Sequence, residues 1–351
     1  MQDSEIDLCD IESYSYGLPE DLIAQRPAER RDGSRLMRVS RHSGSVSHWN
    51  FSDLPQLLRG GDLLVMNDTR VFKARLIGRK ANGGTRAEVF CLSPADLPGV
   101  WRALVRPGKK LPPGTGVELR DGRLVVIGER AGDGLRFVRL PGDISPGELF
   151  EAYGSLPLPP YIKNEASDEE RYQTVYSDRK KNGSAAAPTA GLHFTDQLLA
   201  ELETKGVAHE FITLDVGLGT FRPVKVRDVR EHLMHYELCR IGESQAESIN
   251  MAMEEGRRIV AVGTTVVRTL ESFADGAGRI GHGERRTDIF IRPGYAFKAT
   301  DAMITNFHLP RSTLLMLVAA FAGYEKTMSA YREALESRYR FFSFGDAMLI
   351  E

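Results

Sequence analysis

The sequence has few cysteines, no long hydrophobic run and little net charge, and each shortage excludes a class of protein. Its three cysteines, Cys9, Cys91 and Cys239, are far apart and form no CxxC pair, so neither a disulfide framework nor a cysteine-rich metal site fits. The apolar run from Leu314 to Phe321 is too short to span a bilayer. The acidic opening residues lack the basic start and apolar stretch of a signal peptide. We therefore expect a cytoplasmic protein in a reducing compartment.

The formal net charge of −2 conceals an uneven distribution of charge. Between Val71 and Pro141 there are 14 Lys and Arg against 6 Asp and Glu, a local net of +8, so the remainder carries −10. A basic block on an otherwise acidic protein favours a polyanionic partner. Charges on the solvent-facing sides of strands would give the same count, so charge alone leaves both interpretations open.

The basic block has the pattern of an all-β module. Short alternating runs are separated by turn sequences that contain glycine, at Asn82–Gly84, Asp121-Gly122 and Gly132–Gly134. Such sequences supply the positive φ angles that tight hairpins require. Three hairpin signals without a helical period predict a small antiparallel barrel or sandwich.

The flanking sequence alternates between helical and strand patterns. Thr195 is suited to cap a helix that stops at Gly206, and Ser244 with Glu247 has the spacing of a capping box for a helix through about Arg257. Further predicted elements are a buried strand at 258–262, a turn at 263–265, and helices at 266–273 and 312–322. This alternation predicts an α/β catalytic domain, barrel-like or layered, made of residues 1–70 and 142–351 and interrupted by a β-barrel domain at 71–141.

Two turns are candidates for ligand binding. The glycines of Val216–Phe221 (VGLGTF) would let a backbone approach a ligand closely, but Arg222 replaces the third glycine of a dinucleotide fingerprint. The Gly263–Thr265 turn would direct backbone N–H groups and a positive helix end at an anion, and Arg268 could add a bidentate clamp. An ordinary tight turn and a plain α/β connection are the simpler interpretations of these two segments.

Four histidines could take part in chemistry. His193 precedes a predicted helix cap and His308 precedes a predicted helix, where each ring could transfer protons near neutral pH or simply order the turn. His232 and His235 are three apart with carboxylates nearby, but the HExxH arrangement is absent. We expect no metal.

At these same segments the sequence resembles the S-adenosylmethionine:tRNA ribosyltransferase-isomerase family of the queuosine pathway. The resemblance runs from about residue 10 to the end of the chain in ordered blocks. They include LPEDLIAQRPAERRDGSRLM (18–37), DLLVMNDTRVFKAR (62–75), SAAAPTAGLHFT (184–195), TLDVGLGTFRP (213–223), GTTVVRTLE (263–271) and ITNFHLPRSTLL (304–315).

Membership of this family implies a transferase and isomerase of tRNA modification. The substrate would be tRNA carrying 7-aminomethyl-7-deazaguanine at the wobble position. S-adenosyl-L-methionine would be the co-substrate and ribosyl donor, with no metal, and the products would be epoxyqueuosine-tRNA, adenine and methionine. We expect the enzyme to act as a monomer.

The implied chemistry assigns hypotheses to particular residues. A group that takes and returns protons is needed, and the candidates are His193, His308, Asp215 and Asp288. Candidates for binding the donor are Gly217, Gly219, Thr220, Phe221, Thr264, Thr265 and Arg268. Candidates for phosphate contacts with tRNA are Arg70, Lys73, Arg75, Lys109 and Lys110.

Two other functions remain as alternatives at this stage. An RNA methyltransferase would use the same donor, but it would need a glycine-rich turn near the start of a Rossmann unit, which the sequence lacks; release of S-adenosylhomocysteine would identify it. A non-catalytic RNA-binding protein would use the basic block alone. The His, Asp and Arg residues at turns of the α/β part argue against that second function.

Overall fold

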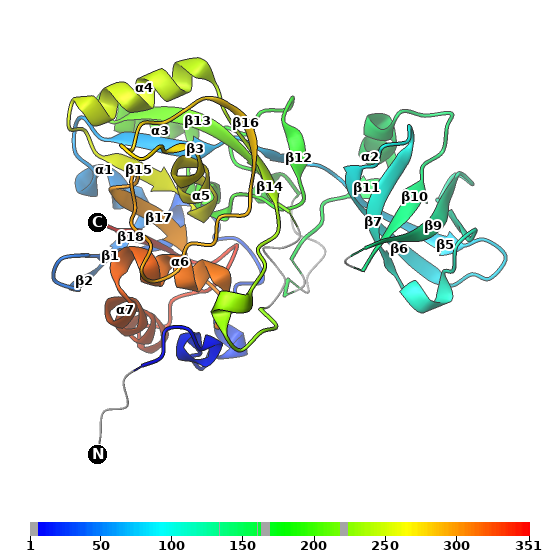
Figure 1. Ribbon diagram of the computed structural model, residues 1–351, viewed down its shortest axis with the longest axis horizontal. Helices are drawn as coiled ribbons and strands as arrows, with labels where there is room; N and C mark the ends of the chain where they lie inside the picture. The colour runs from blue at the N-terminus through cyan, green and yellow to red at the C-terminus, as the bar shows by residue number, and fades with distance from the viewer. Residues whose placement is uncertain (1–5, 133, 160, 163–168, 218–223) are drawn as a thin grey trace. The chain divides into compact units, whose positions relative to one another are not determined.

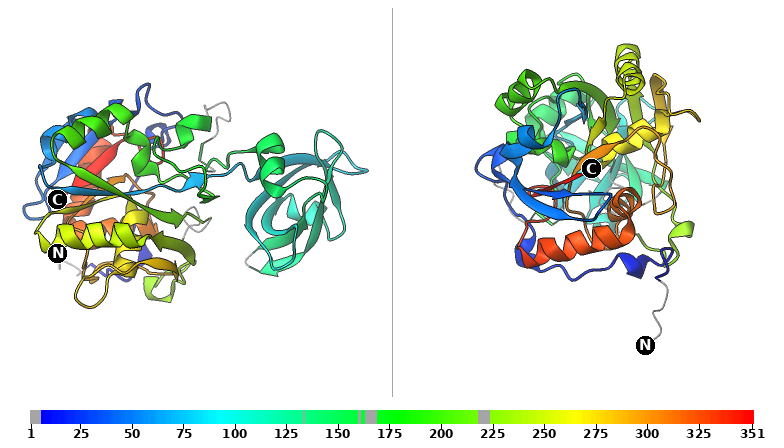
Figure 2. Two further views of the ribbon diagram at one scale, coloured as in Figure 1. Left: turned by 90° about the horizontal axis from the view of Figure 1, so that it is seen from above. Right: turned by 90° about the vertical axis from the view of Figure 1, so that its left-hand side faces the viewer.

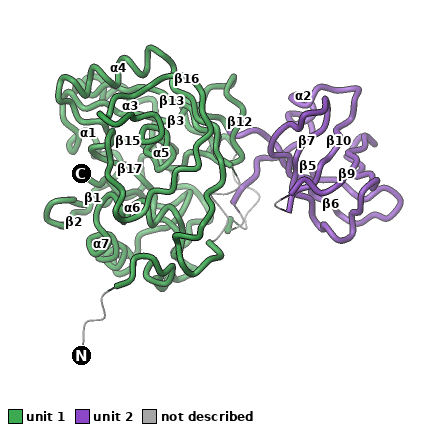
Figure 3. Tube along the Cα trace, viewed as in Figure 1, with its two compact units in different colours: residues 1–70, 160–351 green, residues 71–159 purple. Residues whose placement is uncertain are grey.

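The computed structural model describes residues 6–132, 134–159, 161–162, 169–217 and 224–351. The chain divides into two compact units, one formed by residues 1–70 and 160–351 and the other by residues 71–159 (Figures 1 and 3). None of the described helices is both long and apolar enough to cross a membrane.

The larger unit is built on a nine-stranded mixed sheet with the order β16-β14-β13-β3-β15-β17-β18-β1-β2. Its central four strands, β13, β3, β15 and β17, are parallel, and β3, β15 and β17 are buried along their whole length, as expected for strands covered on both faces. The strand bounds are β1 (Arg35–Val39), β2 (Val46–Asn50), β3 (Leu63–Asn67), β13 (Ala208–Asp215), β14 (Glu237–Ile241), β15 (Ile259–Val262), β16 (Gly283–Thr287), β17 (Ala302–Asn306) and β18 (Ala347–Ile350).

Helices cover both faces of this sheet (Figure 2). Along β3, Leu63 and Val65 belong to one hydrophobic core and Leu64 and Met66 to the other, because successive side chains of a strand point to opposite faces. The α-helices are α1 (Leu54–Leu57) and α3 (Asp196–Thr204), which pack in the second core, and α4 (Glu243–Glu254), α5 (Thr264–Phe273), α6 (Thr313–Ala322) and α7 (Tyr324–Glu336), which pack in the first. The architecture is therefore a layered α/β domain.

Short segments complete the larger unit. The 3-10 helices are η1 (Ile11–Tyr14), η2 (Glu20–Leu22), η3 (Arg31–Gly33), η4 (Phe51–Asp53), η6 (Glu169–Tyr172), η7 (Thr189–His193) and η9 (Val229–Glu231). The two-residue strand β4 (Arg70–Val71) lies where the two units meet along the chain, and β12 (Asn182–Ser184) lies within the larger unit.

The smaller unit is a closed antiparallel barrel. Six strands follow the order β5-β6-β7-β10-β9-β8, and a pairing of β5 with β8 closes the ring. They are β5 (Arg75–Lys80), β6 (Arg86–Pro94), β7 (Val100–Arg106), β8 (Gly116–Glu118), β9 (Leu124–Gly132) and β10 (Leu135–Arg139), with η5 (Gly108–Lys110) after β7. The unit runs beyond residue 141, where the sequence placed its end, because α2 (Pro146–Tyr153) packs on β5 and β11 (Gly154–Ser155) pairs with it.

Several local predictions are confirmed. The three turn sequences join β5 to β6, β8 to β9 and β9 to β10, and Asn82 has the positive φ of 64° that its turn requires. Thr195 caps α3, with its hydroxyl oxygen accepting from the backbone N–H of Leu198 at 3.0 Å. Ser312 caps α6, and Gly323, with φ 92°, ends it.

The predicted capping box at Ser244 and Glu247 is wrong. The N-cap of helix α4 is Gly242, two residues before Ser244, so Ser244 lies inside the first turn. Its hydroxyl donates to the side chain of Gln245 at 3.1 Å. The predicted turn at 263–265 is also shorter than expected, because Gly263 makes the reversal alone with φ 96° and α5 begins at Thr264.

Candidate functional site

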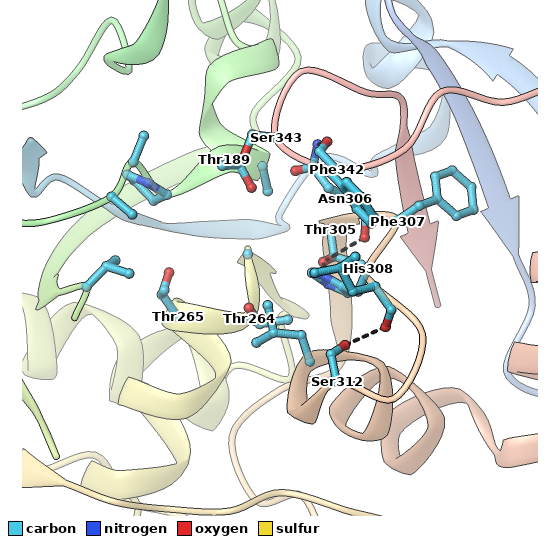
Figure 4. Close-up of a pocket in the computed structure, with 18 of the residues that line it drawn as sticks. Thr189, Thr264, Thr265, Thr305, Asn306, Phe307, His308, Ser312, Phe342 and Ser343 are labelled. Atoms are coloured by element: carbon cyan, nitrogen blue, oxygen red, sulfur yellow. Dashed lines mark hydrogen bonds between the residues drawn. The ribbon is translucent and has the colours of Figure 1, made fainter. Parts of the chain in front are cut away.

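A pocket opens at the carboxyl ends of β15 and β17 (Figure 4). Counted out to its open mouth, it encloses about 710 Å³. Four stretches of chain line it: 186–190, 263–265 after β15, 305–309 at the end of β17, and 342–343. Open α/β sheets bind ligands outside the carboxyl ends of their parallel strands, so this is the expected position for a substrate.

The start of α5 forms one wall of the pocket. Gly263 precedes the helix without a side-chain cap, and Thr264 and Thr265 both line the pocket. The hydroxyl of Thr265 is buried and has no hydrogen-bond partner among the described residues. A ten-residue helix that points its N-terminus at a cavity stabilises negative charge there.

His308 lines the same pocket just after β17. Its Nε2 lies 2.8 Å from Oγ1 of Thr305, and the Thr305 hydroxyl also contacts the carbonyl of Asn306 at 3.4 Å. A hydroxyl can donate and accept, so it either accepts from Nε2–H or donates to Nε2, according to the tautomer of the ring. In the tautomer with the proton on Nε2, the proton-free nitrogen is Nδ1, for which the hydrogen bonds between described residues give no partner. Burial lowers the pKa of His308 to about 3, so the ring is neutral.

The backbone of His308 is held from two sides. Its N–H donates to the hydroxyl of Tyr331 at 2.9 Å, and the hydroxyl of Tyr16 donates to its carbonyl. Both tyrosines come from segments distant in sequence. The backbone of His308 is therefore held by tertiary contacts.

His193 lies near the pocket but does not line it. Its Nδ1 contacts Oγ of Ser34 at 2.7 Å, its Nε2 contacts Nδ2 of Asn306 at 3.2 Å, and the ring stacks on Phe51. Burial lowers its pKa to about 4. Burial is the largest cause of the lowered pKa at both His193 and His308.

The two buried rings predict a loss of stability in mild acid. In the unfolded chain each ring binds a proton near pH 6.5, whereas the folded protein resists protonation until about pH 4 at His193 and about pH 3 at His308. Below pH 6.5 the unfolded state therefore binds more protons, and stability falls as pH falls. At pH 5 we expect a loss of about 2 kcal/mol per ring, measured by urea unfolding at pH 7, 6 and 5. His193→Asn should flatten this dependence, and a pH-independent unfolding free energy would contradict the assignment.

The two carboxylates named as alternative bases lie outside the pocket lining. Asp215, at the end of β13, accepts from Nη1 of Arg240 at 2.9 Å and from the hydroxyl of Thr69 at 3.1 Å. A Cβ at Gly183 would lie only 2.4 Å from Asp215, so the carboxylate is tightly enclosed. Asp288 follows β16 and is exposed.

Arg268 is paired with Glu237 in the interior. Both side chains are buried, and Nη1 of Arg268 donates to Oε2 of Glu237. Oε1 of Glu237 accepts from the backbone N–H of Gly217 at 2.9 Å. The pair thus connects α5 and β14 to the first residue after Val216, while Arg268 itself lies outside the pocket lining. The further candidates Gly219, Thr220 and Phe221 lie outside the described residues.

The basic residues proposed to contact tRNA differ in whether they already form ion pairs within the protein. Arg70 contacts Glu170 at 3.2 Å and Ser177 at 3.0 Å. Within the barrel, Lys73 lies 3.6 Å from Glu151 and Arg75 lies 3.0 Å from Glu88. Lys109 and Lys110 are exposed in η5, with no ion pair to any described residue.

Sequence reasoning missed Asn306, Thr305 and Ser343. All three line the pocket, and Asn306 and Thr305 end a buried strand where polar side chains are unusual. Two polar residues at the end of an apolar strand were the signal in the sequence that could have identified this part of the site. In the described ranges no group of three or more His, Cys, Asp or Glu side chains is placed to hold a metal ion.

The chain is similar to known proteins over nearly its whole length. A family model described as "Queuosine biosynthesis protein" matches residues 11–350. The S-adenosylmethionine:tRNA ribosyltransferase-isomerase of Symbiobacterium thermophilum is 53% identical over 97% of this chain and 99% of its own length, and that of Desulfitobacterium hafniense is 52% identical over 97% and 99%. The crystal structure of S-adenosylmethionine tRNA ribosyltransferase from Thermotoga maritima is 38% identical, covers 97% of this chain and 100% of its own, and superposes with a TM-score of 0.55.

Proposed function

The chain belongs to the S-adenosylmethionine:tRNA ribosyltransferase-isomerase family, and we propose that the pocket beside β15 and β17 is the site of its reaction. The enzyme transfers and isomerises the ribosyl moiety of S-adenosylmethionine onto 7-aminomethyl-7-deazaguanine at the wobble position of tRNA. It yields epoxyqueuosine-tRNA, adenine and methionine, acting in the cytoplasm as a monomer. The observation that carries this function is identity near 50% to named enzymes across 97% of the chain.

The proposed reaction begins at the donor's C5′. The sulfonium acidifies the C5′ protons, so a base removes one to give an ylide. Adenine leaves with the electron pair of the C1′–N9 bond and takes up a proton, and the amine of the tRNA base forms a new C–N bond to the sugar and gives up a proton. Closure of the epoxide forms a C–O bond as the C5′–S bond breaks, and methionine leaves with that electron pair. This route requires one group that takes and returns a proton, in a site that protects reactive intermediates from water.

His308 fits the role of the base best among the candidates. It lines the pocket and its ring is neutral, and we propose the tautomer in which Thr305 accepts from Nε2–H and Nδ1 is the base. The protonated ring then returns this proton to the departing adenine. His193 then acts as a positioning residue through Asn306.

The start of α5 is proposed to hold the donor's carboxylate. Thr264 and Thr265 contribute hydroxyls beside the uncapped backbone N–H groups of the helix. The VGLGTF segment, including Gly217, Gly219, Thr220 and Phe221, stays a proposal for donor contact on its sequence alone. Arg268 supports this segment through Glu237.

The decisive assay analyses the small products. Purified protein given S-adenosylmethionine and tRNA bearing the aminomethyl-deazaguanine base should release adenine and methionine in equal amounts. Chromatography of the quenched reaction, with unmodified tRNA as the control, measures both. Formation of S-adenosylhomocysteine with methylated tRNA would instead identify a methyltransferase, and binding without turnover an RNA-binding protein.

We propose phosphate contacts for the barrel's basic residues, with Lys109 and Lys110 the most effective. They are exposed and without described ion pairs, whereas Lys73 and Arg75 already lie beside glutamates. Replacing both Lys109 and Lys110 by Ala should weaken tRNA binding and lower the slope of log affinity against log salt by roughly 2, since each phosphate contact releases counterions. Filter binding across a salt series measures this. An unchanged slope would mean that these lysines are only solvated.

A further inference from the structure

Asn306 is a pocket residue whose side chain has an unsatisfied, buried acceptor. It is the last residue of β17, is 2% exposed, and lines the pocket (Figure 4). Its Nδ2 donates to the carbonyl of Phe342 at 3.1 Å and contacts Nε2 of His193 at 3.2 Å. Because a carbonyl can only accept, the contact with Phe342 fixes which end of the amide is nitrogen. Oδ1 therefore points away from both partners.

No described residue donates to this Oδ1. Native proteins rarely leave a buried acceptor unsatisfied, and an exception calls for an explanation such as a bound group. His193 strengthens the arrangement: with Nε2 accepting from Asn306, its proton lies on Nδ1, directed at Ser34. The amide is thus held in one orientation before any ligand arrives.

The other residues that line the pocket indicate which kind of hydrogen-bond donor fits Oδ1. The described lining contains hydroxyls such as Thr265, Ser312 and Ser343 and a neutral histidine, but no carboxylate, lysine or arginine. The methionine ammonium stays beside its own carboxylate, which we propose to lie at the start of α5, and an aminomethyl ammonium at Oδ1 would lose hydration without a counter-charge. An uncharged N–H donor suits Oδ1 better.

We propose that Asn306 recognises the exocyclic 6-amino group of the donor's adenine, with Oδ1 accepting one of its N–H groups. This inference rests on the proposed function and deepens it. Asn306 is then a residue that determines specificity: a purine with hydrogen at position 6 leaves Oδ1 unsatisfied, and a purine with a 6-oxo group places two acceptors against each other. Holding the adenine also positions C5′ for the base.

The test compares donors on the unmodified enzyme. Initial rates of methionine release are measured with tRNA bearing the aminomethyl-deazaguanine base, using S-adenosylmethionine, its analogue with hydrogen at position 6, and its 6-oxo analogue. We expect kcat/KM to fall roughly 10- to 100-fold for the first analogue and further for the second, mainly through a higher KM.

Variants then assign the discrimination to one side chain. Asn306→Leu should act on the 6-amino and 6-hydrogen donors with nearly equal kcat/KM. The matched control is Asn250→Leu, because Asn250 is also a buried amide but bonds both ways to the backbone of Ile280 at 2.9 and 2.8 Å, outside the pocket. This control should keep the full discrimination.

The outcomes separate this inference from the proposed function. Equal kcat/KM for the 6-amino and 6-hydrogen donors on the unmodified enzyme would overturn the role of Asn306 while leaving the reaction intact. No release of methionine from S-adenosylmethionine would overturn the proposed function itself. If Asn306→Leu fails to fold, the comparison of donors on the unmodified enzyme still decides.

Discussion

Replacing His308 by asparagine should lower kcat by roughly two to four powers of ten while donor affinity is preserved. Asparagine can keep the hydrogen bond to Thr305 but cannot accept and return a proton. The ring lines the pocket and contacts Thr305 through Nε2, which leaves Nδ1 as the proposed base, and the substitution removes this nitrogen. Single-turnover rates of adenine release, with donor affinity measured in parallel, separate the chemical step from binding.

His193→Asn is the matched comparison for this prediction. His193 is equally buried and neutral, but it contacts Asn306 and Ser34 rather than the pocket. We expect a smaller loss of kcat, together with lower stability from lost stacking on Phe51. Near-normal kcat in both variants would eliminate histidine base catalysis and direct attention to Asp215 and Asp288.

Replacing Arg268 by alanine should lower the free energy of unfolding by about 3 to 5 kcal/mol. Both side chains of its pair with Glu237 are less than a tenth exposed, so the substitution leaves an uncompensated carboxylate in the interior. Chemical denaturation measures this loss. Turnover should also fall, because Glu237 holds the backbone of Gly217.

Two controls define the origin of that loss. Arg279 forms a pair with Glu254 in which both side chains are about two-thirds exposed, and Arg279→Ala should change stability little because water screens such pairs. The double variant Arg268→Met with Glu237→Met removes both charges and should recover much of the stability. If Arg268→Ala instead left stability intact and weakened only donor binding, Arg268 would be a clamp for the donor's carboxylate.

The local sequence determined the turns and helix ends that depend on neighbouring residues alone. Turn residues such as Asn82 set hairpins through backbone conformation, and Thr195 begins α3 by accepting one hydrogen bond from the backbone N–H of Leu198. The alternation of helical and strand patterns predicted the α/β class, and the ordered sequence blocks indicated the family. The capping box at Ser244 was wrong because the N-cap of α4 is Gly242, two residues earlier.

Only the tertiary structure decided which residues share the pocket. His193 and His308 carry the same sequence signal, each just before a helix, yet Asn306 separates His193 from the pocket while His308 lines it. That difference arises where Phe342, near the end of the chain, meets the end of β17. Burial and hydrogen-bond partners depend on such distant segments, and they set both the protonation of the rings and the free oxygen of Asn306.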